Sequence, residues 1–332
     1  MDGIVEEVID SLPVDESVVR MSRKEELLFQ VPPNSPAMTF WRDYEPLAAV
    51  HFSQTYTPST FAPPRDVYCG NFLRLEWQQI QGRQPFYHRN ADVDEVSLQI
   101  AGKRTLMTEL GSLDVKPGDW SRIPVGIAHD NSCWEDIHLL FYFHAAAETG
   151  KIVATAAKRE VQFEGWSPAT VPELLTACLG TRGCDLAVSL VDEELLLKTC
   201  STMQDLSLQR ATDPGNDTEW LYKSQHVWIG VRQLNNAAGK VYTRHRRADA
   251  IHYQLSGTRT LVTQRGTIEL VPGDFISIPM GCAYTSICVG ESSHILVVTS
   301  QEAPLKANAT KMAMPTTIQN VLLARKQISG NI

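Results

Sequence analysis

Two histidines and one glutamate in the first half of the sequence form a candidate metal-binding set. His88, Glu95 and His129 lie in a stretch where glycines and prolines separate short apolar runs. Two imidazoles and one carboxylate are the donors that hold Fe(II) in oxygenases while leaving coordination positions open for substrate and O2. The turn residues between them predict short strands, and rigid strands would keep such a site open.

The residues that must position this set occur twice in the chain, in the same order. The recurring pairs are Gly82 and Gly239, His88 and His245, Gly102 and Gly257, Gly111 and Gly266, Pro117 and Pro272, Asp119 and Asp274, Pro124 and Pro279, and Gly126 and Gly281. Turn residues that recur in register among divergent side chains indicate a duplicated β-unit. Many short strands with evenly spaced turns predict a mainly β protein of two tandem jelly-roll barrels.

Composition shifts divide the chain into five parts. We predict an N-terminal arm over 1–60, a first barrel over 61–150, a mainly helical connector over 151–217, a second barrel over 218–305 and a C-terminal helix over 306–332. Apolar spacing and caps predict helices over Val5–Leu12 and Glu25–Phe29, in the connector segments PATVPELLTACLG and DEELLLKTCSTMQDL, and in the tail. The arm and the additional helix favour a homodimer.

Charge and composition exclude several function classes. The formal net charge of −8 argues against binding to nucleic acid or anionic lipid. No apolar run is long enough to span a membrane, and the acidic N-terminus lacks the pattern of a secretory signal. The seven scattered cysteines are typical of reduced thiols. We therefore expect a cytoplasmic protein.

The second barrel has lost two of the three candidate ligands. It keeps His245, but Ala250 aligns with Glu95 and Tyr284 with His129. A structural role is the simpler interpretation. The interval from His245 to Gly257 is shorter than the one from His88 to Gly102, so counting forward from His245 places His252 at the offset of Glu95. A second, weaker metal site with His245, His252 and His294 as ligands is therefore an alternative.

Two segments of the predicted first barrel resemble the two sequence motifs of the cupin superfamily. The first motif fits Gly82 to Gly102, with Asn90 where many cupins place a further histidine, and the second fits Gly118 to His129. The phrase NADVDEVSLQIAGKRTLMTELGSLDVKPGD is similar to the homogentisate 1,2-dioxygenase-like group. The resemblance covers about 70–145 and 220–300. That group holds its iron in the C-terminal barrel of a longer chain, whereas this ligand set is N-terminal.

The resemblance implies a mononuclear Fe(II) dioxygenase that cleaves a ring or C–C bond of a phenolic or related aromatic substrate with O2. His88, Glu95 and His129 would hold the iron. Two alternatives stay open. One is another metal-dependent enzyme, such as an isomerase or a diketone-cleaving enzyme with Mn, Ni or Zn. The other is a non-catalytic ligand-binding bicupin.

Strand alternation adds candidates for the pocket. If Glu95 points inward, so do Ser97 and Gln99. The remaining candidates are neighbours of the ligands in sequence, and we group them by predicted role. Tyr87, Gln99 and Arg122 are candidate catalytic residues; Ser97, Gln99 and Asn90 are candidate substrate-binding residues; Asp130 and Asn131 are candidate partners of a ligand imidazole; and His138, which recurs as His294, is a structural position.

Overall fold

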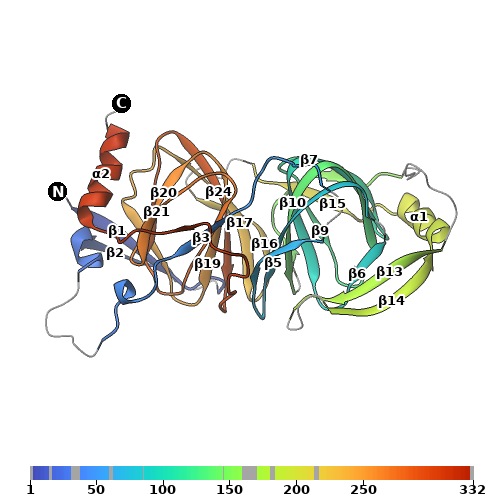
Figure 1. Ribbon diagram of the computed structural model, residues 1–332, viewed down its shortest axis with the longest axis horizontal. Helices are drawn as coiled ribbons and strands as arrows, with labels where there is room; N and C mark the ends of the chain where they lie inside the picture. Colours follow the sequence, from blue (N-terminus) through green and yellow to red (C-terminus); the bar gives the residue numbers. More distant parts are fainter. Residues whose placement is uncertain are drawn as a thin grey trace.

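The computed structural model shows a mainly β protein whose two tandem jelly-roll barrels lie side by side (Figure 1). The two barrels predicted from the repeat are confirmed. The structure describes residues 3–14, 17–30, 38–59, 63–84, 86–144, 146–158, 170–179, 184–212 and 217–329. Among these residues, neither α-helix has the length and apolarity that a membrane crossing requires.

The first barrel is organised around two long antiparallel strands, β7 and β10. Its strands are β4 (Arg65–Cys69), β5 (Arg74–Arg83), β6 (Tyr87–Asn90), β7 (Asp94–Thr108), β8 (Gly111–Val115), β9 (Trp120–Ile123) and β10 (His129–Phe143). β10 lies between β7 and β5, and β7 also pairs with β8 and β9. β6 reaches β10 at one position, where His129 lies opposite His88.

The second barrel consists of two facing sheets and repeats this arrangement. Its strands are β16 (Thr218–Lys223), β17 (Val227–Asn235), β18 (Val241–His245), β19 (Asp249–Ser256), β20 (Arg259–Thr263), β21 (Gly266–Leu270), β22 (Asp274–Ile278), β23 (Tyr284–Ile287) and β24 (Glu291–Thr299). The turn glycines also repeat in conformation, because Gly102 and Gly257 have φ values of 68° and 65°. A Cβ at either position would collide with a backbone carbonyl oxygen, so both turns require glycine.

The N-terminal arm belongs to the second barrel. The predicted helix over Val5–Leu12 is wrong, because Ile4–Asp10 forms β1, which pairs in parallel with β18 and antiparallel with β2 (Val19–Lys24). Glu7 of β1 is fully buried and binds Arg244. Pairing with a sheet therefore outweighs local helical spacing here. The second predicted arm helix is present as a short 3-10 helix, η1 (Glu25–Leu28).

Other arm and tail segments extend the same barrel. They are η2 (Trp41–Asp43), β3 (Ala48–His51), β25 (Lys311–Met312) and helix α2 (Ile318–Ser329). The predicted C-terminal helix is confirmed by α2. A buried ion pair between Arg325 of α2 and Glu25 of η1 fixes this helix beside the arm at one end of the molecule (Figure 1).

The described part of the connector is mostly strand, not helix as predicted. It contains β12 (Lys151–Thr155), β13 (Thr170–Ala177), β14 (Cys184–Asp192), α1 (Glu193–Thr202) and β15 (Ser207–Arg210), and the short strand β11 (Ala147–Glu148) precedes it. Only α1 confirms the predicted helical character, and its N-cap is Asp192, whose carboxylate accepts a hydrogen bond from the Leu195 N–H at 3.2 Å. β13 pairs in parallel with β6 and antiparallel with β14, so the strand satisfies its backbone groups on both sides.

An apolar core joins the two barrels. The outward side chains of β7, Val96 and Leu98, belong to one buried cluster with Ile229, Ile251 and Ile295 of the second barrel. Because successive side chains on a strand alternate between faces, this contact directs Glu95, Ser97 and Gln99 into the first barrel. The packing between barrels thus fixes which face of β7 carries the candidate site.

Candidate metal centre

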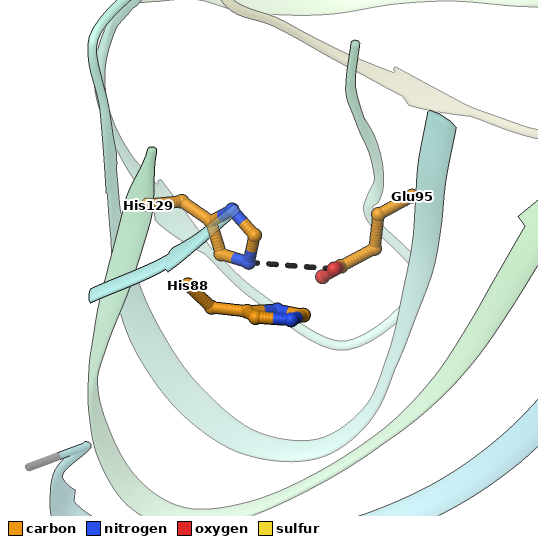
Figure 2. Close-up of side chains that lie close together, drawn as sticks. All are labelled: His88, Glu95 and His129. Atoms are coloured by element: carbon orange, nitrogen blue, oxygen red, sulfur yellow. Dashed lines mark ion pairs between the residues drawn. The ribbon is translucent and has the colours of Figure 1, made fainter. Parts of the chain in front are cut away.

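The three predicted ligands converge inside the first barrel from three strands. His88 comes from β6, Glu95 from β7 and His129 from the first position of β10 (Figure 2). One donor atom from each lies within 4.8 Å of the others, and among the residues described no other group of this kind is found. Strand pairing brings the histidines together, since His88 and His129 are direct cross-strand neighbours.

The geometry suits one small divalent cation. His129 Nε2 lies 3.3 Å from Glu95 Oε2, and the rings of His88 and His129 meet edge to face with centroids 5.3 Å apart. Metal–donor bonds of about 2.0–2.2 Å allow two ligands of one ion to lie up to about 4.4 Å apart. A shift of a few tenths of an ångström therefore completes the site, and the donor set fits Fe(II) as well as other divalent ions.

Two hydrogen bonds orient the ligands. His129 Nδ1 lies 3.2 Å from the Ile127 carbonyl oxygen, which selects the tautomer that leaves Nε2 free to face Glu95. Asn90, a predicted substrate-binding residue, is buried and donates from Nδ2 to Glu95 Oε2 at 3.1 Å. Its Oδ1 accepts from the Cys178 thiol at 3.1 Å. Asn90 thus orients the carboxylate from a position where many cupins have a histidine.

The structure corrects the predicted partner of the imidazole. Asp130 does not reach the ring of His129; it accepts a hydrogen bond from Arg83 Nε at 2.7 Å. Asn131, the other predicted partner, lines the cavity described below. The backbone carbonyl of Ile127 holds the ring instead, and a backbone group of this kind leaves no signature in a sequence pattern.

The site holds two opposite charges in a buried environment. Burial alone would raise the pKa of Glu95, but the imidazoles of His129 and His88 and the amide of Asn90 outweigh burial and hold it well below 4.5. Burial alone would lower the pKa of His129, and Glu95 raises it above 6.5 instead. An ionised Glu95 is therefore ready to bind a cation, which would replace the proton of His129.

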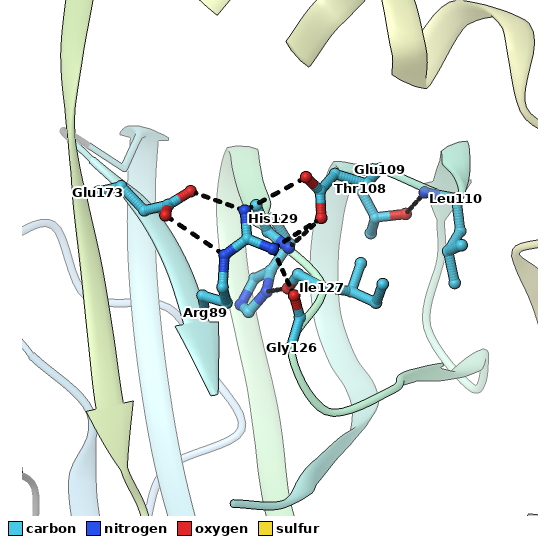
Figure 3. A network of polar contacts seen from close by, with 9 residues as sticks. Arg89, Thr108, Glu109, Leu110, Gly126, Ile127, His129 and Glu173 are labelled. Atoms are coloured by element: carbon cyan, nitrogen blue, oxygen red, sulfur yellow. Dashed lines mark hydrogen bonds and ion pairs between the residues drawn. The ribbon is translucent and has the colours of Figure 1, made fainter. Parts of the chain in front are cut away.

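A charged network supports the strand and turn behind the ligands (Figure 3). Arg89, next to His88, binds Glu109 on one side and Glu173 of β13 on the other. It also donates to the carbonyl of Gly126, and Glu109 accepts from the Ala128 N–H at 3.0 Å. The network ties β6 to the turn that precedes His129 and so fixes the spacing of the two histidines.

The ligands open onto a cavity of about 450 Å³. Its lining combines apolar and polar side chains. The apolar side chains are Phe86, Leu140, Tyr142 and Leu174; the polar ones are Arg74, Glu76, Gln78, Gln84, Asn131, His138 and Thr176. Sequence reasoning missed the polar side chains of β5, although Arg74, Glu76 and Gln78 alternate with Leu75 and Trp77 along that strand.

Glu76 stands out among these groups. Burial raises its pKa to about 7, against the opposing effect of its ion pair with Arg74. A carboxyl group with this pKa can give or take a proton near neutral pH. His138, predicted as structural, lines the cavity as well, and its Nδ1 lies 2.6 Å from Asp136 Oδ2.

The other predicted catalytic and substrate-binding residues lie outside this lining. The Tyr87 hydroxyl donates to Glu193 of α1 at 3.2 Å, and Arg122 pairs with Asp94 at 3.0 Å. Ser97 and Gln99 are buried as predicted, but they contact other interior groups. Ser97 Oγ lies 2.7 Å from Ser121 Oγ, and Gln99 donates to Asp136.

Among the described residues, the second barrel offers no equivalent centre. His245 Nε2 lies 2.9 Å from the Tyr284 hydroxyl, and its Nδ1 lies 2.8 Å from Asp10 of the arm. A guanidinium nitrogen of Arg259 lies 2.9 Å from His252 Nδ1. The alternative set of His245, His252 and His294 is therefore not arranged as metal ligands, and a cation at His252 would face a positive charge.

Comparison with known proteins finds similarity to solved structures alone. No family model and no curated protein match the chain. Similar solved structures include a cupin 2 conserved barrel domain protein from Leptotrichia buccalis, with 8% identity, a TM-score of 0.48, and coverage of 77% of this chain and 98% of that one. A mutant of Bacillus subtilis oxalate decarboxylase has 12% identity, a TM-score of 0.46 and 90% coverage of both chains.

Two further structures complete this comparison. Bacillus subtilis oxalate decarboxylase, described with Mn(II) centres, has 12% identity, a TM-score of 0.43, and coverage of 83% of this chain and 82% of that one. AerE from Microcystis aeruginosa has 9% identity, a TM-score of 0.41, and coverage of 75% of this chain and 100% of that one. At these levels of similarity, none of them assigns an activity, a substrate or a metal to this protein.

Proposed function

We propose that the protein is a mononuclear non-haem Fe(II) dioxygenase that cleaves a ring or C–C bond of a phenolic or related aromatic acid. The observation that carries the proposal is the convergence of His88, Glu95 and His129 at one wall of a cavity of about 450 Å³. A two-histidine, one-carboxylate set leaves coordination positions open, and the cavity has room for a single-ring substrate.

A ferrous ion held by these residues would supply the redox chemistry that lets O2 react with an organic substrate. The chain's own side chains bind and orient that substrate. Phe86, Leu140 and Leu174 can pack against a ring. Among the polar lining residues, Asn131 has a buried Oδ1 without a hydrogen-bond partner among the described residues, and this oxygen is an acceptor for a substrate hydroxyl group.

Proton transfer at the substrate falls to Glu76 in this proposal. Its pKa of about 7 lets it accept a proton from a phenolic hydroxyl group and return it later. The earlier candidates Tyr87 and Arg122 are committed to Glu193 and Asp94. Two of the three candidate ligands are buried, Glu95 at 4% exposure and His129 at 2%, which limits the access of bulk water.

The test is anaerobic reconstitution with Fe(II), followed by metal analysis and O2 uptake with catechols, hydroquinones and aromatic acids. We expect one iron per chain, O2 consumption that depends on one of these substrates, and ring-opened products. Glu95→Ala should abolish all three. Turnover without O2 consumption would remove the dioxygenase proposal.

A second candidate is a metal-dependent isomerase that needs no O2. The observation that favours it is Glu76, which supplies a proton-transfer group beside the ligands without any redox step. The same donor set accepts Mn, Ni or Zn. This candidate predicts full activity under argon, with Zn or Mn in place of iron, and loss of activity in Glu76→Gln.

A further inference from the structure

The interior of the second barrel contains a buried guanidinium group without a carboxylate partner. Arg259 is 1% exposed, and the ion pairs of the described residues include none that it makes. It donates to Gln254 Oε1 at 2.7 Å, Ser286 Oγ at 2.6 Å and His252 Nδ1 at 2.9 Å. Burial lowers the pKa of Arg259 to about 9, so it stays a cation at neutral pH. A buried, unpaired cation is costly unless a negative charge accompanies it.

The cross-strand register of the two barrels shows why Arg259 has no carboxylate partner: acidic residues of the first barrel are replaced in the second. The histidines His138 and His294 occupy equivalent places, opposite Gln78 and Arg232 respectively. Counted from them, three interior carboxylates of the first barrel are replaced by uncharged residues in the second. The pairs are Glu76 and Gly230, Glu95 and Ala250, and Asp136 and Ser292.

The number of interior cations does not fall, although Arg74 of the first barrel is replaced by Trp228. Arg104 of the first barrel is kept as Arg259, since both donate to the equivalent residues Ser97 and His252. Gln78 is replaced by Arg232. The one arm carboxylate seen at this interior, Asp10, lies against His245 Nδ1 at 2.8 Å. The second barrel therefore reverses the charge of the first, from a set that suits a cation to one that suits an anion.

The exchange also leaves hydrogen-bonding groups unused. In the first barrel His138 Nδ1 has Asp136 as partner at 2.6 Å, whereas His294 Nδ1 has no partner among the described residues. Burial and the charge of Arg259 hold the pKa values of His252 and His294 well below 6.5, so both rings are neutral. Because His252 Nδ1 accepts from Arg259, the ring proton of His252 is on Nε2, which also lacks a partner.

Two of these residues, Arg232 and His294, line a second cavity, of about 320 Å³, whereas Arg259 and His252 lie behind its lining. Arg232, His294, Tyr284 and Lys240 line it. We propose that this cavity binds a small oxyanion, the carboxylate of a small organic acid or inorganic phosphate, held by Arg232 beside His294. Arg259 adds its charge from the adjoining interior. The site is distinct from the metal centre and does not rest on the proposed dioxygenase activity.

The test is isothermal titration of the full-length protein, in chloride-free buffer, with inorganic phosphate in one series and acetate, malonate and benzoate in another. We expect one saturable site per chain. Saturation by phosphate alone, or by carboxylates alone, supports the site and identifies the source of the anion. The absence of saturable binding in both series would overturn the proposal.

Two variants introduce the first barrel's residue at the equivalent position of the second barrel, and a third variant is the control. Arg232→Gln removes the cation, and Ser292→Asp supplies a carboxylate beside Arg259 and His294. Each should weaken binding at least about tenfold, as expected for the loss of a charged hydrogen bond. Lys103→Gln removes the same charge from an exposed residue of the first barrel and should leave affinity unchanged. Equal affinity in wild type, Arg232→Gln and Ser292→Asp would contradict the assignment.

Discussion

Replacing Asn90 by alanine tests whether the metal centre depends on the residue that orients its carboxylate. Asn90 and Glu95 are 1% and 4% exposed, and the hydrogen bond between Nδ2 and Oε2 measures 3.1 Å. A hydrogen bond to a charged group is worth about 1.5–3 kcal/mol. Since 1.4 kcal/mol corresponds to a factor of ten, its loss predicts roughly 10- to 100-fold weaker metal binding.

The assay is competition for Fe(II), or for Mn(II) as a redox-stable substitute, against a chromophoric chelator under argon. Asn131→Ala is the matched control, because Asn131 lines the same cavity but makes no hydrogen bond to a ligand side chain in the structure. Circular dichroism establishes that both variants are folded. Equal metal affinity for Asn90→Ala and wild type, within about twofold, would refute the assigned orienting role.

Four other predictions have defined outcomes. Glu95→Ala should eliminate stoichiometric metal binding while the thermal unfolding transition persists, because the second barrel already carries alanine, Ala250, at the equivalent position. Retention of one metal ion per chain would contradict the ligand assignment. Metal affinity should fall as pH is lowered through the raised pKa of His129, by up to about tenfold per pH unit, and a flat profile in chelator competition would be incompatible with displacement of that proton. In the metal-free protein, the ion pair of Glu95 and His129 stabilises the fold fully between pH 4.5 and 6.5, the ordinary pKa values of the two groups. The free energy of unfolding in urea should therefore include this contribution within that window, and the contribution should decline as pH falls below it or rises above it. Glu25→Gln should lower the free energy of unfolding by about 3–5 kcal/mol, because it leaves Arg325 buried without its partner; a urea-unfolding difference below about 1 kcal/mol would count against this.

The sequence predicted the duplicated barrels and the convergence of His88, Glu95 and His129 because both depend on local signals. Turn residues such as Gly102 and Gly257 are required by a positive φ and by a close carbonyl, so they persist in both repeats while other side chains diverge. The ligands follow from donor type and spacing, and alternation along β7 correctly placed Ser97 and Gln99 in the interior.

The rest depended on contacts that the local pattern does not contain. Ile4–Asp10 and Thr170–Ala177 become strands because β18 and β6 offer them edges, a choice made by distant segments. Tyr87 and Arg122 neighbour the ligand motifs in sequence, but their charged partners lie on the connector and on β7. Glu76 was missed because its importance comes from burial beside the ligands, which the β5 sequence suggests only through its alternation.

The most direct test of the metal centre is anomalous diffraction from crystals loaded anaerobically with Fe(II), with data collected at the iron absorption edge. The account predicts one strong peak within bonding distance of His88 Nε2 or Nδ1, a Glu95 carboxylate oxygen and His129 Nε2, and none in the second barrel, where Arg259 opposes a cation. A peak coordinated by other residues, or no peak among these three side chains at full iron loading, would contradict it.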